Sequence, residues 1–356
     1  STTYAPGLRL NWELDLWGRL ADAEKAAFKD AEVAAAALEG ARLSLSAQVT
    51  RAWVRMNAAA RRVELARESV QIQEQVEEVV QERYQRGIAS AQQYYRVQGN
   101  LEEARAVLES RIEQKERQQR GLDVLVGRYP EGQVQAAAQD LPANLPSIPV
   151  GVPSDLLKRR PDLAEARARY EAAHARASEA AKLRLPTISL TGSYGTSSEE
   201  LNQVLDGDYT VWSLASNLAQ PIFQGGRLKA QADAARSNWL GTWAAYRASM
   251  LQAFEEVETA LNAEKSLNQQ GASRKQALQH ARKNEKRAYE AYRGGLDTIL
   301  PVLEQQRERL QAQLNYLNTR EQYLTNRVDL YLALGGAPIG SEKKSPKKWS
   351  MLNHSN

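Results

Sequence analysis

Three absences limit what this sequence can be. It contains no cysteine, which excludes a disulfide framework, a thiolate metal site and a cysteine nucleophile. It has no run of about 18 apolar residues, so we expect no membrane-spanning helix. No signal peptide begins at Ser1, and the chain is therefore either intracellular or a mature or truncated product.

The sequence also lacks an excess of one charge and any catalytic motif. Its 47 basic and 43 acidic residues alternate along helical patterns, which is typical of solvated faces and argues against a nucleic-acid partner. His174, His280 and His354 are far apart without ligand spacing, and Gly225-Gly226-Arg227 lacks the Lys-Ser/Thr of a P-loop. We therefore expect no metal, no cofactor and no enzyme activity.

An internal repeat is present instead. When the chain is shifted by 208 positions, the following residues coincide without a gap: Gly18-Arg19-Leu20 with Gly226-Arg227-Leu228, Tyr84 with Tyr292, Gly87 with Gly295, and Gly127 with Gly335. Each copy contains one long and one shorter helical run, at 18–86 and 90–126 and again at 226–293 and 298–334. The repeat predicts two similar helical hairpins.

Turn and seam signals support these hairpins. Gly87, and the pair Gly294-Gly295, can adopt the left-handed conformation that ends a helix, and Ser90 to Gln93 has the spacing of a capping box. The long runs would extend about 100 Å. A seam with 4,3 spacing includes Leu303, Arg307, Leu310, Leu314, Leu317, Glu321 and Leu324. Helices alone would fit a coiled-coil scaffold equally well.

Three segments with alternating residues favour a different architecture. Along 8–16 every even residue is apolar and every odd one polar, and 187–194 alternates in the same way, whereas 209–222 is less regular. Such strands suit the lipid-facing wall of a β-barrel. The alternative is a soluble antiparallel sheet with one solvent-exposed face. The apolar positions of the first two segments, which we expect to face lipid, are Leu8, Leu10, Trp12, Leu14, Leu16, Ile188, Leu190 and Tyr194. The third segment has Trp212, Leu214, Leu218 and Ile222 on one face. Arg9, Asn11, Glu13 and Asp15 would face the lumen.

Four segments carry a resemblance to a known family. They are Trp12-Glu-Leu-Asp-Leu-Trp-Gly-Arg19, Pro153-Ser-Asp-Leu-Leu-Lys-Arg-Arg-Pro-Asp162, Pro186-Thr-Ile-Ser-Leu-Thr-Gly192 and Pro221-Ile-Phe-Gln-Gly-Gly-Arg227. Together with the hairpin turns they resemble the TolC-type outer-membrane efflux proteins, in particular the branch that serves resistance-nodulation-division pumps. The resemblance implies a mostly α protein with a small β part, in which long coiled-coil hairpins form a trimeric α-barrel joined to a transmembrane β-barrel.

The same resemblance implies a domain plan. Residues 7–17 and 185–224 would be barrel strands in the outer membrane, and 18–127, 161–184 and 225–335 the periplasmic helical barrel. Residues 128–160 would form an equatorial segment, and 336–356 a disordered tail. The second half has a helix and a strand without a counterpart in the first half. We therefore expect an upstream helix and strand, where a lipidated cysteine would also lie.

Partners and a gate are implied as well. A homotrimer would receive drugs or other small toxic compounds from an inner-membrane pump through a periplasmic adaptor. The adaptor would contact the hairpin tips at Gly87, Ile88, Ser90, Gly294, Gly295, Leu296, Asp297 and Thr298. Leu300, Glu304 and Arg307 share one helical face and would form the periplasmic aperture, unless Glu304 and Arg307 are an ordinary exposed pair. A soluble coiled-coil scaffold or adaptor, or a long-helix adhesin, is the alternative.

Overall fold

The computed structural model describes residues 4–132, 134, 141, 142, 145, 159–200, 206, 208 and 210–336. The chain divides into two compact units. The strand unit comprises residues 1–41 and 153–254, and the hairpin unit comprises 42–152 and 255–356. Most described residues are helical and a small part is β, which confirms the predicted fold class. No helix in the described ranges is apolar over a length that would cross a membrane.

Four long helices carry the repeat. Helices α1 (Arg19–Gln85) and α5 (Arg227–Arg293) have 67 residues each, whereas α2 (Ala91–Leu125) and α6 (Ile299–Ala333) have 35 each. The bounds of α5 and α6 are those of α1 and α2 plus 208. The repeat predicted from the sequence is therefore also a repeat of structure.

The two hairpin turns use the same backbone geometry. Gly87 has φ of 75°, and the N–H of Ile88 donates to the oxygen of Arg83 at 2.8 Å. Gly295 has φ of 71°, and the N–H of Leu296 donates to the oxygen of Ala291 at 2.9 Å. A glycine in the left-handed region followed by this long backward hydrogen bond is a Schellman motif, which satisfies the last carbonyl groups of a helix.

The two shorter helices begin differently. The Ser90 hydroxyl accepts from the N–H of Gln93 at 3.3 Å, and the Gln93 side chain accepts from the N–H of Ser90 at 3.1 Å, so the predicted capping box forms. At the second hairpin Thr298 makes no side-chain cap. The residue equivalent to Gln93 is Pro301, which has no N–H to be capped.

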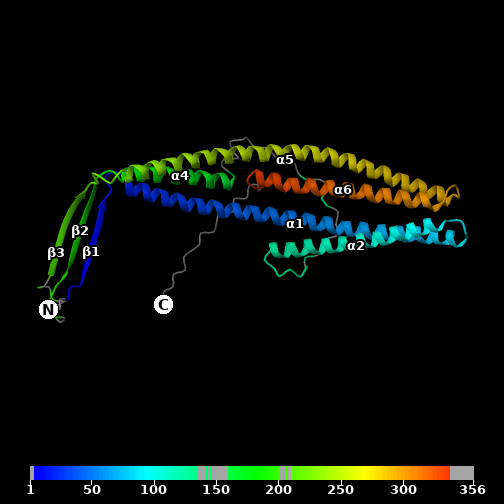
Figure 1. The fold of residues 1–356 in the computed structure, drawn as a ribbon, viewed down its shortest axis with the longest axis horizontal. Coiled ribbons are helices and arrows are strands. Elements are labelled where there is room, and N and C mark those ends of the chain that lie inside the picture. Colours follow the sequence, from blue (N-terminus) through cyan, green and yellow to red (C-terminus); the bar gives the residue numbers. More distant parts are fainter. Residues whose placement is uncertain are drawn as a thin grey trace. The chain divides into compact units, whose positions relative to one another are not determined.

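The hairpin unit is a layer of helices in the order α5, α6, α1, α2 (Figure 1). Ion pairs join its outer neighbours: Arg309 with Glu285 at 2.8 Å between α6 and α5, and Arg105 with Glu74 at 3.2 Å between α2 and α1. The central contact is apolar. It contains Ala58, Leu65 and Ile72 of α1 with Leu303, Leu310 and Leu317 of α6.

This central contact confirms part of the predicted seam. Every seventh residue from Leu303 to Leu324 is buried, as knobs-into-holes packing requires. Arg307 and Glu321 do not belong to the buried row, because Arg307 is exposed and Glu321 forms an ion pair with Arg62. One row of the seam, at every seventh residue, is therefore buried and apolar, whereas the other row contains the charged Arg307 and Glu321 and the partly buried Leu314.

The strand unit contains the three strands, the helix α4 (Pro161–Lys182), and the first parts of α1 and α5. Pro161 occupies the first turn of α4, as predicted, and Asp162 lies beside it. Ion pairs hold α4 on α1, with 2.9 Å between Lys29 and Glu171. On its other side, the rings of Tyr170 and Trp243 bring α4 against α5 at 5.3 Å between centroids.

The sheet has the order β1 (Gly7–Leu14), β2 (Thr187–Thr196), β3 (Thr210–Ala219), and both pairs are antiparallel (Figure 1). The predicted strands 8–16 and 209–222 were too long at their C-terminal ends, because β1 ends at Leu14 and β3 at Ala219, so Leu16 and Ile222 lie beyond them. Leu16 follows Asp15, whose carboxylate caps α1. Ile222 follows Pro221, which cannot donate a ladder hydrogen bond.

The remaining domain predictions fall largely on residues outside the description. This is true of most of 128–160 and of 337–356 in the expected tail.

Candidate functional site

The register of the sheet brings the predicted lipid-facing residues together. Trp12 lies opposite Leu190, Leu14 opposite Ile188, and Leu8 opposite Tyr194. Directly opposed residues project from the same face of a sheet. The third strand extends this face, because Trp212, Leu214 and Leu218 lie opposite Tyr194, Gly192 and Ile188. We call the resulting surface the apolar sheet face.

Much of the apolar sheet face is exposed. Leu8 is 80%, Leu10 64% and Trp12 53% exposed, whereas Ile188 and Leu190 are half-buried because β2 has a neighbour on each side. The opposite face is polar on β1 and the middle of β2, and its residues are Arg9, Asn11, Glu13, Ser189, Thr191 and Ser193. A chain with one large exposed apolar face needs an apolar environment to cover it.

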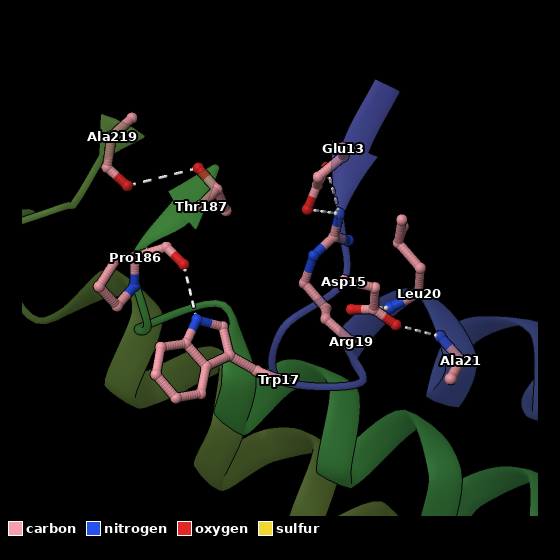
Figure 2. Close-up of polar contacts among 9 residues, drawn as sticks. All are labelled: Glu13, Asp15, Trp17, Arg19, Leu20, Ala21, Pro186, Thr187 and Ala219. Carbon is pink, nitrogen blue, oxygen red and sulfur yellow. Dashed lines mark hydrogen bonds and ion pairs between the residues drawn. The ribbon is translucent and has the colours of Figure 1, made fainter. Parts of the chain in front are cut away.

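The connection from β1 to α1 is built from charged side chains (Figure 2). The Asp15 carboxylate accepts from the N–H groups of Leu20 at 3.1 Å and Ala21 at 2.9 Å, which are free at a helix start. Glu13 binds the Arg19 guanidinium through both oxygens, at 2.7 and 2.8 Å. Asp15 lies beyond the end of β1, and its carboxylate caps the helix, so its expected place on the lumen side stays a prediction.

A second contact joins this connection to the start of β2. The indole Nε1 of Trp17 donates to the backbone oxygen of Pro186 at 2.8 Å (Figure 2). Beside it, the Thr187 hydroxyl donates to the oxygen of Ala219 at 3.3 Å. Neither the alternating pattern nor the resemblance indicated these contacts. The signal that it missed was an Asp placed just before a helix start, which is a known cap pattern.

The hairpin tips present apolar side chains. Ile88 is 63% and Leu296 85% exposed, and they occupy equivalent places in the two turns. The first tip is stiffened by Tyr84 and Tyr94, whose rings stack 5.1 Å apart. The structure thus groups the predicted tip residues in two turns: Gly87, Ile88 and Ser90 in one, and Gly294, Gly295, Leu296, Asp297 and Thr298 in the other.

The predicted aperture residues lie on the first turns of α6. Leu300 is half-buried, while Glu304 and Arg307 are exposed. Within the described residues no ion pair joins Glu304 to Arg307. Both line a groove together with Ser69 of α1 and Arg111 of α2. Their charges are therefore available to groups outside the chain.

Comparison with known proteins identifies the chain's relatives. Residues 1–128 and 152–336 match the family described as outer membrane efflux protein. The outer membrane protein OprJ of Pseudomonas aeruginosa is 33% identical over 338 residues, which are 94% of this chain and 71% of OprJ. The pyoverdine export outer membrane protein OpmQ of Pseudomonas putida is 31% identical over 98% of this chain and 73% of its own length.

A solved structure agrees with these relatives. The crystal structure of a membrane protein from Pseudomonas aeruginosa has a TM-score of 0.85 and 33% identity, covering 94% of this chain and 76% of that one. The chain therefore belongs to the outer membrane efflux protein family, the TolC-type transport channels of the bacterial outer membrane that extend into the periplasm.

Proposed function

We propose that this protein is one subunit of a homotrimeric outer-membrane channel. The channel is a passive exit duct for drugs or other small toxic compounds, which an inner-membrane pump delivers with the help of a periplasmic adaptor. The observation that carries the proposal is the apolar sheet face, whose exposed residues include Leu8, Leu10 and Trp12. Lipid is the environment that covers such a face without a cost in free energy.

The unpaired edges of the sheet support an assembly of more than one copy of the chain. Within the described strands, β1 and β3 each pair on one side only. An open edge in lipid leaves backbone N–H and C=O groups unpaired at several kcal/mol each. Strands from neighbouring copies, and any strand upstream of residue 1, would close these edges into a shared transmembrane β-barrel.

The helical part supports the duct. The hairpin tips expose Ile88 and Leu296, an apolar pair that fits an adaptor protein. Glu304 and Arg307, with Leu300 beside them, would meet their counterparts from the other copies at the aperture. The relative OpmQ is named for pyoverdine export, and such a cargo is consistent with an exit duct for small molecules.

The proposal is tested by mass and by conductance. Purified in detergent, the protein should have the mass of a trimer, and in a planar bilayer it should open ion-conducting pores. A monodisperse, water-soluble monomer would favour a soluble coiled-coil scaffold or adaptor instead. A trimer that never conducts would contradict the duct but not the assembly.

A further inference from the structure

A cavity of about 410 Å³ opens between the middle of α1 and the last turn of α2, two helices that lie side by side (Figure 1). We call it the α1–α2 cavity. Its walls are mostly apolar and are formed by Val49, Trp53, Leu122, Val126 and Val134. The volume lies within the range of about 300 to 1,000 Å³ that is usual for small-molecule sites. The α1–α2 cavity therefore has the size and the lining of a binding site.

The polar groups of this cavity are few. Among the described residues that line it, Arg128 is the one charged residue, and Thr50 contributes a hydroxyl group. That hydroxyl donates to the backbone oxygen of Ser46 at 2.8 Å, within its own helix. The Arg128 side chain is exposed, and no ion pair within the described part of the chain includes it. The cavity thus combines an apolar wall with one positive charge that no described residue neutralises.

The turn that follows α2 places Arg128 at the cavity. Gly127 has φ of 74°, and the N–H of Arg128 donates to the backbone oxygen of Asp123 at 2.8 Å. This is the same helix-ending motif that forms both hairpin turns. The position of Arg128 therefore follows from the way in which the helix ends.

Two further hydrogen bonds hold the chain after this turn against α2. The Asp123 carboxylate, which belongs to a residue 1% exposed, accepts from the N–H of Gly132 at 2.7 Å. The Gln119 amide donates to the backbone oxygen of Val134 at 2.9 Å. Neither Asp123 nor Gln119 lines the cavity, so both act as positioning residues. Because the wall is built before a ligand arrives, binding costs less ordering entropy.

The second copy of the repeat differs at the polar positions. The equivalents of Thr50 and Arg128, 208 positions farther along, are Glu258 and Gly336. The second copy therefore has a carboxylate and lacks the cation at these two places, although its helices have equivalent bounds. The repeat preserves the helical framework, and the positive charge at the cavity is a feature of the first hairpin.

We propose that the α1–α2 cavity binds a small aromatic organic anion, such as an aromatic carboxylate. The apolar walls and the Trp53 ring cover the aromatic body, since aromatic pairs are favourable beyond the area that they bury. The Arg128 guanidinium pairs with the carboxylate through charge-assisted hydrogen bonds. The inference does not depend on the exit duct, because the whole lining belongs to the hairpin unit of one chain.

Protection of a single thiol tests the cavity, because the chain has no cysteine of its own. Thr50→Cys places a thiol in the lining, and the whole chain in isolated membranes is treated with N-ethylmaleimide, with and without 2-naphthoate. We expect naphthoate to slow labelling at about millimolar concentration. Val126→Cys is a second reporter if the first variant does not accumulate. Ser46→Cys, one helical turn away and outside the lining, is the control and should react at one rate throughout.

Two further ligands and two further variants test the class of ligand. 2-Naphthylmethylamine has the ring with a positive charge, and octanoate has the negative charge without a ring, so both should protect Thr50→Cys less than naphthoate does. In this background, Arg128→Gln should raise the naphthoate concentration for half protection about two- to fivefold. Arg120→Gln removes another exposed arginine of α2, which pairs with Glu116 at 3.4 Å, and should leave that concentration unchanged.

The outcomes separate the cavity from its ligand class. Absence of protection at both reporters, at naphthoate concentrations well above millimolar, overturns the site. Equal protection of Ser46→Cys also overturns it, because naphthoate would then coat the protein surface in general. Equal protection by the amine, or no effect of Arg128→Gln, overturns the preference for an anion, and equal protection by octanoate overturns the preference for a ring. None of these results changes the mass or the conductance by which the channel itself is tested.

Discussion

The indole nitrogen of Trp17 lies 2.8 Å from the backbone oxygen of Pro186 and donates a hydrogen bond to it. Trp17 follows the first strand, and Pro186 precedes the second. One side chain therefore ties together two of the connections between the sheet and the helices of the strand unit. Through it, the direction of α1 is coupled to the direction of β2.

Removing this bond should loosen the connection. Trp17→Phe keeps an aromatic ring but has no donor, so the oxygen of Pro186 loses its partner at a net cost of about 1 kcal/mol. We expect a lower melting temperature in detergent, followed by circular dichroism. Trp53→Phe, at a site in the middle of α1, is the matched control. Equal losses in both variants would show that the hydrogen bond is not the cause.

The apolar sheet face makes a prediction about insertion. Trp12→Arg puts a charge on that face, where Arg costs about 2 to 4 kcal/mol at the bilayer midplane, whereas Asn11→Arg puts it on the polar face. The first variant should assemble poorly in the outer membrane and the second normally. Membrane fractionation and immunoblotting would measure this. Equal assembly of the two would count against lipid contact at Trp12.

The helices were predictable from the sequence because their signals are local and repeated. The capping box at Ser90 and the glycine at Gly87 act within a few residues, and the repeat supplies the glycine signal a second time at Gly295. The strand ends were not predictable in the same way. The alternating pattern continues through Leu16, but the Asp15 carboxylate accepts hydrogen bonds from the first N–H groups of α1. Periodicity alone does not show that a carboxylate will cap a helix instead of extending a strand.

The site was predictable only in part, for a different reason. Alternation alone gave the apolar sheet face, since a period of two assigns each side chain to a face. The partners of Glu13 and Trp17 required the tertiary fold, because Arg19 and Pro186 meet them only after the chain has turned. The predicted aperture residues would act between copies in the proposed trimer, so a single chain shows their exposure but not those contacts.

An ion pair between α1 and α4 makes a prediction about pH. The Glu171 carboxylate lies 2.9 Å from the Lys29 ammonium, and this bond lowers its pKa below the ordinary 4.5. A carboxyl group whose pKa is lower in the folded state than in the unfolded state stabilises the fold at a pH above its unfolded-state pKa. This stabilisation is lost as the pH falls through the folded-state pKa. The coupling should therefore be present at neutral pH and be lost in acid, as the pH falls through the lowered pKa of Glu171.

A double-mutant cycle with Lys29→Met and Glu171→Gln measures this coupling. At pH 7 the two changes together should cost less than the sum of the single changes, by about 0.5 to 1 kcal/mol. At low pH the decrease in melting temperature of the double variant should equal the sum of the decreases in the two single variants. Coupling that persists unchanged in acid would show that Lys29 and Glu171 interact through packing rather than charge.

The groove at Glu304 makes the last prediction. Leu300, Glu304 and Arg307 follow one another on the face of α6 near its start, and in the described chain Glu304 and Arg307 form no pair with each other. In a trimer, Leu300 would form an apolar ring and Glu304 a ring of carboxylates. Like charges held close repel one another unless a cation or an arginine lies between them.

Such a ring should attract cations while the apolar ring restricts their passage, so its removal should be visible in single channels. We expect Glu304→Ala with Arg307→Ala to raise conductance in planar bilayers and to weaken block by divalent cations, because both the bound cation and the narrowing side chains are lost. Lys286→Ala with Glu290→Ala removes another exposed pair of opposite charge, on α5 near the same tip, and should change neither property. Unchanged conductance in the first variant would place the narrowest point elsewhere along the tunnel, and Glu304 and Arg307 would then be ordinary surface charges.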